Sequence, residues 1–239
     1  MGNYSFNHVF PRKIIIPLII SVLLLNFYFI SVAHYIVFVY YILLLGGGGI
    51  LLWKYREQLS NILLNWKLRP LIKFVLLGYS AVLTEEILVA LVHALNSGAS
   101  LTGWGQLILQ FWAFNIFAFT GFIFGWYFLY RRYRYTSANL FFIIGLWGLY
   151  AEKTLSYLRT DFWGAILLIL PTMSVYNLII APALASLPPA PDNRVKTWKK
   201  CLYSFIISFV FSLLPVIALT YLRAHWPLLF PPCAYIPCS

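Results

Sequence analysis

The sequence predicts an all-α, polytopic integral membrane protein with about seven transmembrane helices, its N-terminus inside and its C-terminus outside. The chain has 239 residues, of which 62% are hydrophobic and only 10% are charged, and its mean hydropathy is +0.83. A soluble domain carries roughly 25% charged residues. A surface this apolar must face lipid. Two further observations divide the chain into spans: the length of the apolar segments and the charge of the loops between them.

Seven apolar segments are each long enough to cross the hydrocarbon core of a bilayer, which takes about 20 residues of helix. They cover residues 14–33, 35–53, 71–95, 106–130, 139–158, 163–187 and 201–222. The first two are separated by a very short turn, so one long bent hairpin is the alternative there. The first segment exceeds the apolar core of a signal peptide, which has about 7–15 residues, so we expect it to be retained. The whole chain, 1–239, then forms a single transmembrane domain.

The loop after the second span predicts a short helix near residues 56–68. Leu59, Ile62, Leu63 and Trp66 recur there at helical spacing among polar neighbours. An amphipathic helix of this kind suits the surface of a membrane, where its apolar face lies in the interface. We therefore expect this segment to lie on the bilayer without crossing it.

Basic residues occupy every second connection between the spans. Cytoplasmic loops of membrane proteins carry an excess of Lys and Arg. The basic residues before the first span and after the second, fourth and sixth are Arg12, Lys13, Lys54, Arg56, Lys67, Arg69, Arg131, Arg132, Arg134, Arg194, Lys196, Lys199 and Lys200. The alternate loops hold only Arg159 and Arg223. This alternation predicts the orientation stated above and explains the net charge of +11. We expect a multi-pass protein of the cell membrane, with the lipid bilayer as its partner and no nucleic acid.

Three of the six acidic residues, Glu85, Glu86 and Glu152, fall inside predicted spans. An ionisable group near the bilayer centre costs about 2.5–3.5 kcal/mol on insertion scales, so such groups usually have a function or a partner. Glu85 and Glu86 diverge by about 100° around the third span, so at least one of them must point into the bundle. Glu86 is the better candidate, because Tyr79 and His93 share its helix face at seven-residue spacing.

Other polar residues in the spans could meet these carboxyl groups. We take Glu86, Glu85 and Glu152 as candidate catalytic residues, and His93, Asn115, Tyr176 and Asn177 as candidate substrate-binding residues. The alternative is structural. A buried Glu bonded to Asn, Tyr or Lys can simply fix helix packing, and interhelical polar contacts contribute about 0.6 kcal/mol on average.

Glycines mark places where the helix backbone comes close to something or lines a space. The four glycines Gly46–Gly49 form either a close-packing face or an unwound stretch that lines a cavity. Gly121 and Gly125 make a small-xxx-small pattern in the fourth span, and Gly145 and Gly148 lighten one side of the fifth. These two pairs predict contacts between helices.

The sequence gives no sign of a cofactor or a metal site. It has no paired-His haem pattern, no nucleotide-binding loop and no metal-type Cys or His spacing. Cys201 is expected to act as a small apolar residue at the start of the last span. Cys233 and Cys238 lie in the tail beyond it, where a disulfide and two free thiols are both open.

The pair Glu85-Glu86 resembles the opening of the Glu-Glu-x-x-x-Arg motif in the intramembrane peptidases of the prenyl-protein (CAAX) processing and bacteriocin-protection family. Ala90 stands where that motif has Arg. The family's later Phe-x-x-x-His motif and its further His-containing motif are missing as well. The resemblance covers two residues and does not assign the chain to that family.

Three functions fit these observations. The first is an enzyme that uses glutamate acid–base chemistry on a lipid, isoprenoid or membrane peptide, with Glu86 as the acid or base. The second is a proton- or cation-coupled transporter that uses the same carboxylates as protonation sites. The third is a non-catalytic assembly subunit whose polar residues fix helix packing. The identity of any protein partner is left open.

Overall fold

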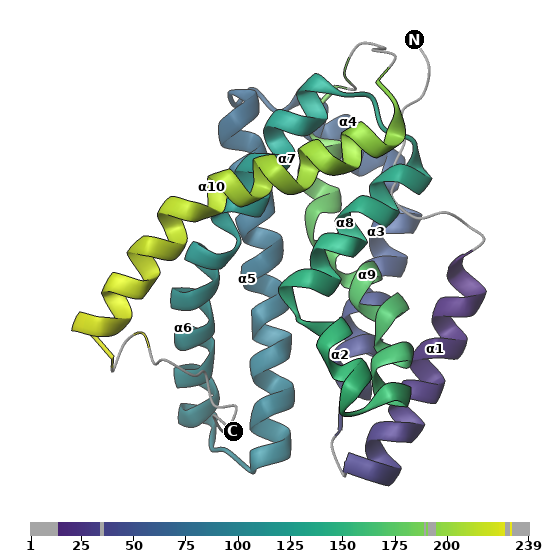
Figure 1. Ribbon diagram of the computed structural model, residues 1–239, viewed down its shortest axis with the longest axis vertical. Helices are drawn as coiled ribbons and strands as arrows, with labels where there is room; N and C mark the ends of the chain where they lie inside the picture. The colour runs from purple at the N-terminus through teal and green to yellow at the C-terminus, as the bar shows by residue number, and fades with distance from the viewer. Residues whose placement is uncertain (1–13, 34–35, 189, 191–194, 228–229, 231–239) are drawn as a thin grey trace.

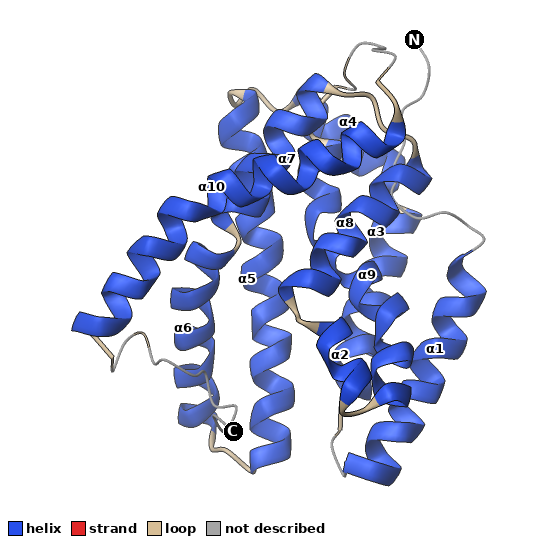
Figure 2. Ribbon diagram, in the orientation of Figure 1, coloured by secondary structure: helices blue, strands red, loops and turns tan. Residues whose placement is uncertain are grey.

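The regular structure of this chain is helical throughout the residues that the computed structural model describes, which are 14–33, 36–188, 190, 195–227 and 230. Figure 2 shows these elements, all of them helices within those ranges. The all-α prediction is therefore confirmed for this part of the chain. His8, His34, Cys233 and Cys238 lie outside the described residues.

The helices follow one another with short connections (Figure 1). They are α1 (Ile15–Tyr28), η3 (Phe29–Ala33), α2 (Phe38–Tyr41), η4 (Ile42–Gly49), α3 (Ile50–Lys54), α4 (Arg56–Asn65), α5 (Pro70–Ser97), α6 (Leu101–Ala118), α7 (Thr120–Arg132), α8 (Ser137–Ala151), η5 (Thr154–Arg159), α9 (Phe162–Ala185) and α10 (Thr197–His225). The elements η3 and η4 are π-helices, and η5 is a 3₁₀-helix.

Among the described residues, four helices are long and apolar enough to cross a membrane: Ile15–Val32, α5, α9 and α10. Two bent pairs raise the number to six if each pair is one span. In one pair, the continuous helical stretch formed by α2, η4 and α3 is followed by α4 at a bend of 72°. In the other pair, α6 is followed by α7 at a bend of 44°. A short helix is present in the region 56–68 as α4, which ends at Asn65, and its position on the surface of a bilayer stays a prediction.

The fourth predicted span, 106–130, differs from the structure because it is two helices. The helix begins earlier, at Leu101, and breaks at Phe119 between α6 and α7. Thr120 lies at this break and its hydroxyl donates to the carbonyl of Ile116. A Ser or Thr side chain that bonds back to the preceding turn bends a helix in this way.

The fifth predicted span, 139–158, is wrong in its second half. Helix α8 ends at Ala151, and Lys153 adopts the left-handed conformation with φ of 51° before η5 begins. A left-handed residue cannot continue an α-helix. The 15 residues of α8 rise about 22 Å, less than the roughly 30 Å of a hydrocarbon core. Glu152 and Lys153 therefore follow the end of α8 and do not lie inside a continuous helix.

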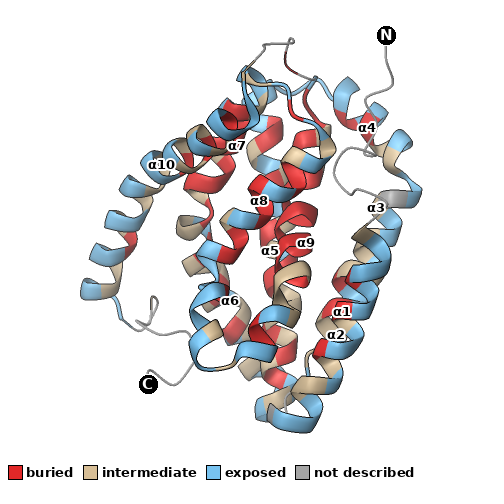
Figure 3. Cartoon of the chain, turned by 45° about the vertical axis from the view of Figure 1, so that its right-hand side comes forward, coloured by how far each residue is buried: buried red, intermediate tan, exposed pale blue. Residues whose placement is uncertain are grey.

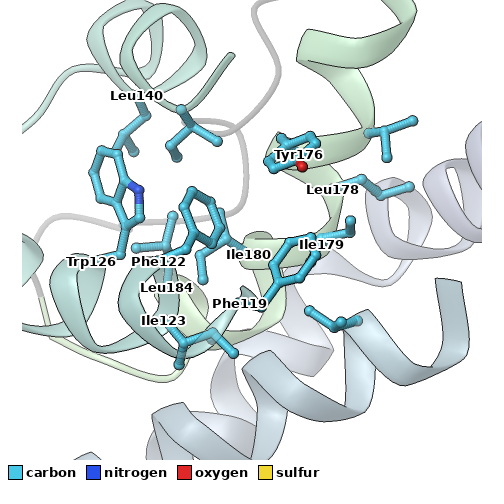
Figure 4. Close-up of a cluster of buried hydrophobic side chains, with 14 of the residues drawn as sticks. Phe119, Phe122, Ile123, Trp126, Leu140, Tyr176, Leu178, Ile179, Ile180 and Leu184 are labelled. Carbon is cyan, nitrogen blue, oxygen red and sulfur yellow. The ribbon is translucent and has the colours of Figure 1, made fainter. Parts of the chain in front are cut away.

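Helix α9 forms the centre of the molecule. It contacts α1, α5 and α8, and nearly every residue from Pro171 to Leu184 is buried. Figure 3 shows buried residues along α9 and also on α5 and α7. The core packs side chains of α7, α8 and α9 together, among them Phe122, Trp126, Leu140, Ile180 and Leu184 (Figure 4).

Helix α10 lies across α7 (Figure 1) and meets it at glycines. A Cβ atom added to Gly121 would lie 1.9 Å from Ser212 Oγ, and one added to Gly125 would lie 2.8 Å from Ser208 Oγ. On the other side of the core, a Cβ on Gly145 would meet Met173 at 2.5 Å. The glycines predicted as helix contacts are confirmed in this role.

The basic connections lie together at one end of the bundle. Lys73 of α5 is buried and its Nζ donates to the carbonyls of Leu63, at 2.7 Å, and Leu64, at 3.3 Å, near the end of α4. Lys200 at the start of α10 donates to the carbonyl of Arg134. Cations favour the carbonyl-rich C-terminus of a helix, which accounts for the burial of Lys73.

Because α7 and α10 touch at Gly121, Gly121→Ala should lower the free energy of unfolding by about 1–3 kcal/mol through overpacking. Thermal unfolding of the purified protein in detergent measures this change. The matched control is Gly105→Ala on α6, where an added Cβ meets nothing within 4 Å. There we expect no loss, and a gain of up to roughly 1 kcal/mol from helix propensity. Equal effects at both positions would contradict the close approach of α10 to α7.

Candidate functional site

Glu85 and Glu86 are both buried in the middle of α5, each with 6% of its surface exposed. The prediction that at least one of them points into the bundle is confirmed, and the structure shows that both do. The helix face of Glu86 is turned toward α6: the Tyr79 hydroxyl donates to the Ile116 carbonyl at 3.2 Å, and His93 packs edge-on against Phe111.

Glu85 is the better connected of the two carboxyl groups. The hydroxyl of Tyr40, from α2, donates to Glu85 Oε1. Glu86 is the next residue on the same helix, and its carboxyl group is near enough to that of Glu85 to interact with it electrostatically.

Glu152 joins this pair from the end of α8. The hydroxyl of Tyr176, on α9, donates to Glu152 Oε1 at 2.7 Å. The Glu152 carboxyl is also near enough to Glu85 to interact with it electrostatically. The end of α8 at Ala151 turns this exposed residue back toward the bundle.

The position of Tyr176 is fixed by apolar contacts on several sides. Its ring stacks on Phe119 with centroids 5.7 Å apart and meets Phe122 edge-on at 5.8 Å (Figure 4). A Cβ on Gly148 would lie 2.6 Å from this ring. Because Gly148 has no side chain, α8 leaves room for the ring of Tyr176, whose hydroxyl bonds to Glu152.

Tyr41 completes the group. It is 8% exposed, its ring lies 5.0 Å from that of Tyr40 in an edge arrangement, and its hydroxyl interacts electrostatically with Glu152 and Glu85. We name these residues the carboxyl–tyrosine cluster. Its members are Tyr40, Tyr41, Glu85, Glu86, Glu152 and Tyr176.

The cluster consists of proton donors and acceptors. Its carboxyl and phenol groups can exchange protons with one another or with a bound molecule. In the described part of the chain, no group of three or more His, Cys, Asp or Glu side chains is arranged to hold a metal ion.

Three predicted site residues lie elsewhere. Asn177 is fully buried, but its Nδ2 donates to the carbonyls of Phe141, at 3.0 Å, and Met173, at 2.8 Å, so it ties α9 to α8. Asn115 is buried on α6 without a hydrogen bond to either carboxyl of the pair. His93 is half-buried between α5 and α6, where its ring packs edge-on against the ring of Phe111. The structure brings together only Glu85, Glu86, Glu152 and Tyr176 of the predicted set.

The sequence pattern did not mark Tyr40 and Tyr41 as candidate site residues. Tyrosines are common in membrane proteins as anchors at the interface, so their side chains carried no special signal. Their place just before four glycines, with no charged residue nearby, was the available clue.

A pocket of about 600 Å³ lies beside the cluster, between α1, η4 and α9. Its walls are apolar except for Tyr41, which belongs to the cluster. The lining residues are Ile15, Leu18, Ile19, Val22, Leu23, Tyr41, Ile42, Leu45, Gly46, Gly49, Ile50, Leu52, Leu178 and Ala181. One member of the cluster, Tyr41, is thus part of the wall of this pocket.

The glycines of η4 contribute to this pocket and do not form a close contact with another helix. A Cβ on Gly46 would meet nothing within 4 Å, and one on Gly47, Gly48 or Gly49 would meet only a carbonyl of η4 itself, at 3.8 Å. The close-packing interpretation of Gly46–Gly49 is therefore wrong. The cavity-lining alternative describes the segment better, because Gly46 and Gly49 line the pocket. The segment is a π-helix, however, and not an unwound stretch.

Comparisons with models of protein families, with curated proteins and with solved structures found no match to this chain.

The bond from Tyr176 to Glu152 should contribute to stability. Tyr176→Phe removes the donor and should lower the free energy of unfolding by about 1–3 kcal/mol, because it leaves a carboxyl oxygen without its partner. Denaturant unfolding in detergent measures the change. As a control, Tyr157→Phe on the exposed surface of η5 should change stability by less than about 0.5 kcal/mol. A Tyr176→Phe protein as stable as the parent would contradict the bond.

Asn177 should be structural. Asn177→Ala removes one hydrogen bond from α9 to α8 and one within α9. We expect the free energy of unfolding to fall by about 1–3 kcal/mol in the same measurement. Asn65→Ala, at the exposed end of α4, is the control and should stay within about 0.5 kcal/mol of the parent. If Asn177→Ala is as stable as Asn65→Ala, Asn177 does not tie the two helices together.

Proposed function

We propose that this chain is a multi-pass membrane enzyme that uses glutamate acid–base chemistry on a substrate taken from the lipid phase. The observation that carries the proposal is the carboxyl–tyrosine cluster beside an apolar pocket of about 600 Å³. Acids and phenols that are removed from water and placed next to an apolar binding space are the components such a reaction needs.

The membrane setting rests on the four to six helices that are long and apolar enough to cross a bilayer. Helices α1 and α10 support it further, because they carry large apolar side chains on their exposed faces, such as Ile16, Leu23, Leu214 and Ile217. In this proposal the protein lies in the cell membrane, and the end with the basic connections faces the cytoplasm. The seven-span count would require α8 with η5 to cross as one unit.

Glu85 has the central role in the proposed reaction. It accepts a hydrogen bond from Tyr40 and is the direct neighbour of Glu86 on α5, so it can give a proton to the substrate or take one and exchange it with its neighbours. Glu86 is the second carboxyl group of the pair, next to Glu85 on α5. Tyr176 positions Glu152 at the edge of the cluster. This proposal gives Glu85 the central role that the sequence-based choice gave to Glu86, with Glu85 or Glu152 as its modulator.

A proton-coupled transporter would use the same carboxyl groups, because carboxyls inside membrane helices can load and release a proton. The pocket favours the enzyme. A transporter needs a path along the membrane normal that its cargo can follow, whereas this pocket is lined by apolar side chains of α1 and η4, several of which are exposed on the outer surface of the bundle.

The test compares membranes that contain the parent chain with membranes that contain Glu85→Gln, using untargeted mass spectrometry of their lipids and membrane peptides. We expect at least one species to be converted in the parent membranes, with the conversion reduced by about 10²-fold or more in Glu85→Gln. Glu57→Gln, on the exposed surface of α4, is the matched control and should behave as the parent. Tyr40→Phe, which keeps the ring and removes the bond to Glu85, should also reduce the conversion.

Thermal unfolding separates the outcomes. Loss of conversion in a Glu85→Gln protein that still folds supports the enzyme. If the lipid and peptide profiles are unchanged while proteoliposomes show a proton flux that Glu85→Gln abolishes, the chain is a transporter. If Glu85→Gln lowers only the unfolding temperature, the cluster has a packing role. Either of the last two results rejects the proposed enzyme.

A further inference from the structure

We propose that the pocket between α1, η4 and α9 holds the hydrocarbon chain of an amphiphilic substrate, with the polar head of that molecule at the carboxyl–tyrosine cluster. This inference rests on the proposed function for the role of the cluster. The binding of the chain is a separate property of the pocket and can be tested without any turnover.

The dimensions of the pocket suit a long, narrow ligand. On α1 the lining runs from Ile15 to Leu23, eight residues along one helix, which is a rise of about 12 Å. The volume of about 600 Å³ falls within the range of roughly 300–1,000 Å³ that is usual for sites of small ligands. The pocket therefore extends along the helices, in the direction that an acyl or isoprenoid chain takes in a bilayer.

The composition of the walls decides the chemistry of the occupant. Apart from Tyr41, every lining residue is an aliphatic side chain or a glycine. A peptide or a sugar would bury polar groups there without partners, at a cost of about 1–3 kcal/mol for each group. An apolar cavity is also a poor site for water. A hydrocarbon chain has no such cost, so it is the occupant that these walls favour.

Tyr41 joins the pocket to the cluster. It is the polar side chain of the lining, its ring contacts that of Tyr40, and Tyr40 donates to Glu85. A molecule whose chain fills the pocket would thus end beside the phenols and carboxyls. The polar head and the apolar chain are recognised by adjoining parts of one site.

The pocket also has a route of entry from the lipid phase. Among its lining residues, Ile19, Leu23, Ile42 and Ile50 are exposed on the surface of the bundle, at 53%, 65%, 59% and 61%. The rim of the pocket is thus formed by the same apolar surface that would face lipid. A chain can enter sideways between α1 and η4 and does not need to leave the apolar phase.

Two glycines keep this space open. Gly46 and Gly49 line the pocket, and an added Cβ on either would meet no other helix, so no packing contact requires them to be bare. Glycine in a helix costs about 1 kcal/mol relative to Ala, a cost that the pocket explains. A bulky side chain at Gly46 or Gly49 would take up the volume of the ligand. Gly47 belongs to the same run but does not line the pocket, so it provides a control.

The experiment is photolabelling of the purified full-length chain in detergent. The probe is palmitic acid that carries a diazirine near its terminal methyl group, and the competitor is unlabelled palmitic acid. Peptide mass spectrometry should find labelling of α1 and η4 that the competitor removes. Butyric acid, with a short chain, should not compete. We expect Gly49→Phe, and independently Gly46→Phe, to reduce the competed labelling by about tenfold or more, while Gly47→Phe retains it.

The outcomes distinguish this inference from the proposed function. It is overturned if the parent shows no competed labelling of α1 and η4, or if that labelling survives in folded Gly49→Phe and Gly46→Phe proteins. Glu57→Gln, on the exposed surface of α4, leaves both the pocket walls and the cluster intact and should label as the parent does. If the labelling is intact but the protein converts no lipid or peptide, the pocket still binds hydrocarbon chains and the proposed enzyme is rejected.

Discussion

The burial of carboxyl groups among apolar helices is the constraint on which this structure depends. A buried acid without hydrogen-bond partners is too costly to keep, so every helix near Glu85 and Glu86 has to accommodate the pair. Helix α2 brings Tyr40 to Glu85, and α9 presents Tyr176 to Glu152. Residues of α2 and α9 thus supply the phenol groups that bond to these carboxyls.

The second requirement is close approach between helices, since association in lipid depends on packing and polar contacts more than on the hydrophobic effect. The central helix α9 is buried on all sides and meets α8 where that helix has only glycine, at Gly145 and Gly148. The same device sets α10 across α7. In η4 the glycines serve the opposite purpose, because their bare backbone leaves a volume unfilled. The same residue type therefore brings helices together in one region and keeps a space open in another.

The limits of prediction from sequence follow from these contacts. Apolar segments long enough to cross lipid located most helices, and the rarity of acids in such segments drew attention to Glu85 and Glu86. What the sequence could not reveal depends on tertiary contacts. Lys153 ends α8 through a left-handed backbone, and Thr120 breaks the helix before α7, and neither residue type dictates such a turn by itself. Asn177 looked like a site residue because it is a polar residue within an apolar span, but its side chain bonds to α8.

The crossing of α7 and α10 has a consequence for the way this chain can evolve. At Gly121 the backbone of one helix almost touches Ser212 of the other, so the space is shared between two positions far apart in the sequence. A side chain at position 121 would meet the backbone of Ser212 as well as its hydroxyl, so no change at position 212 makes room for it unless the helices separate. Lineages descended from this chain should therefore keep glycine at position 121, while the exposed faces of both helices drift freely.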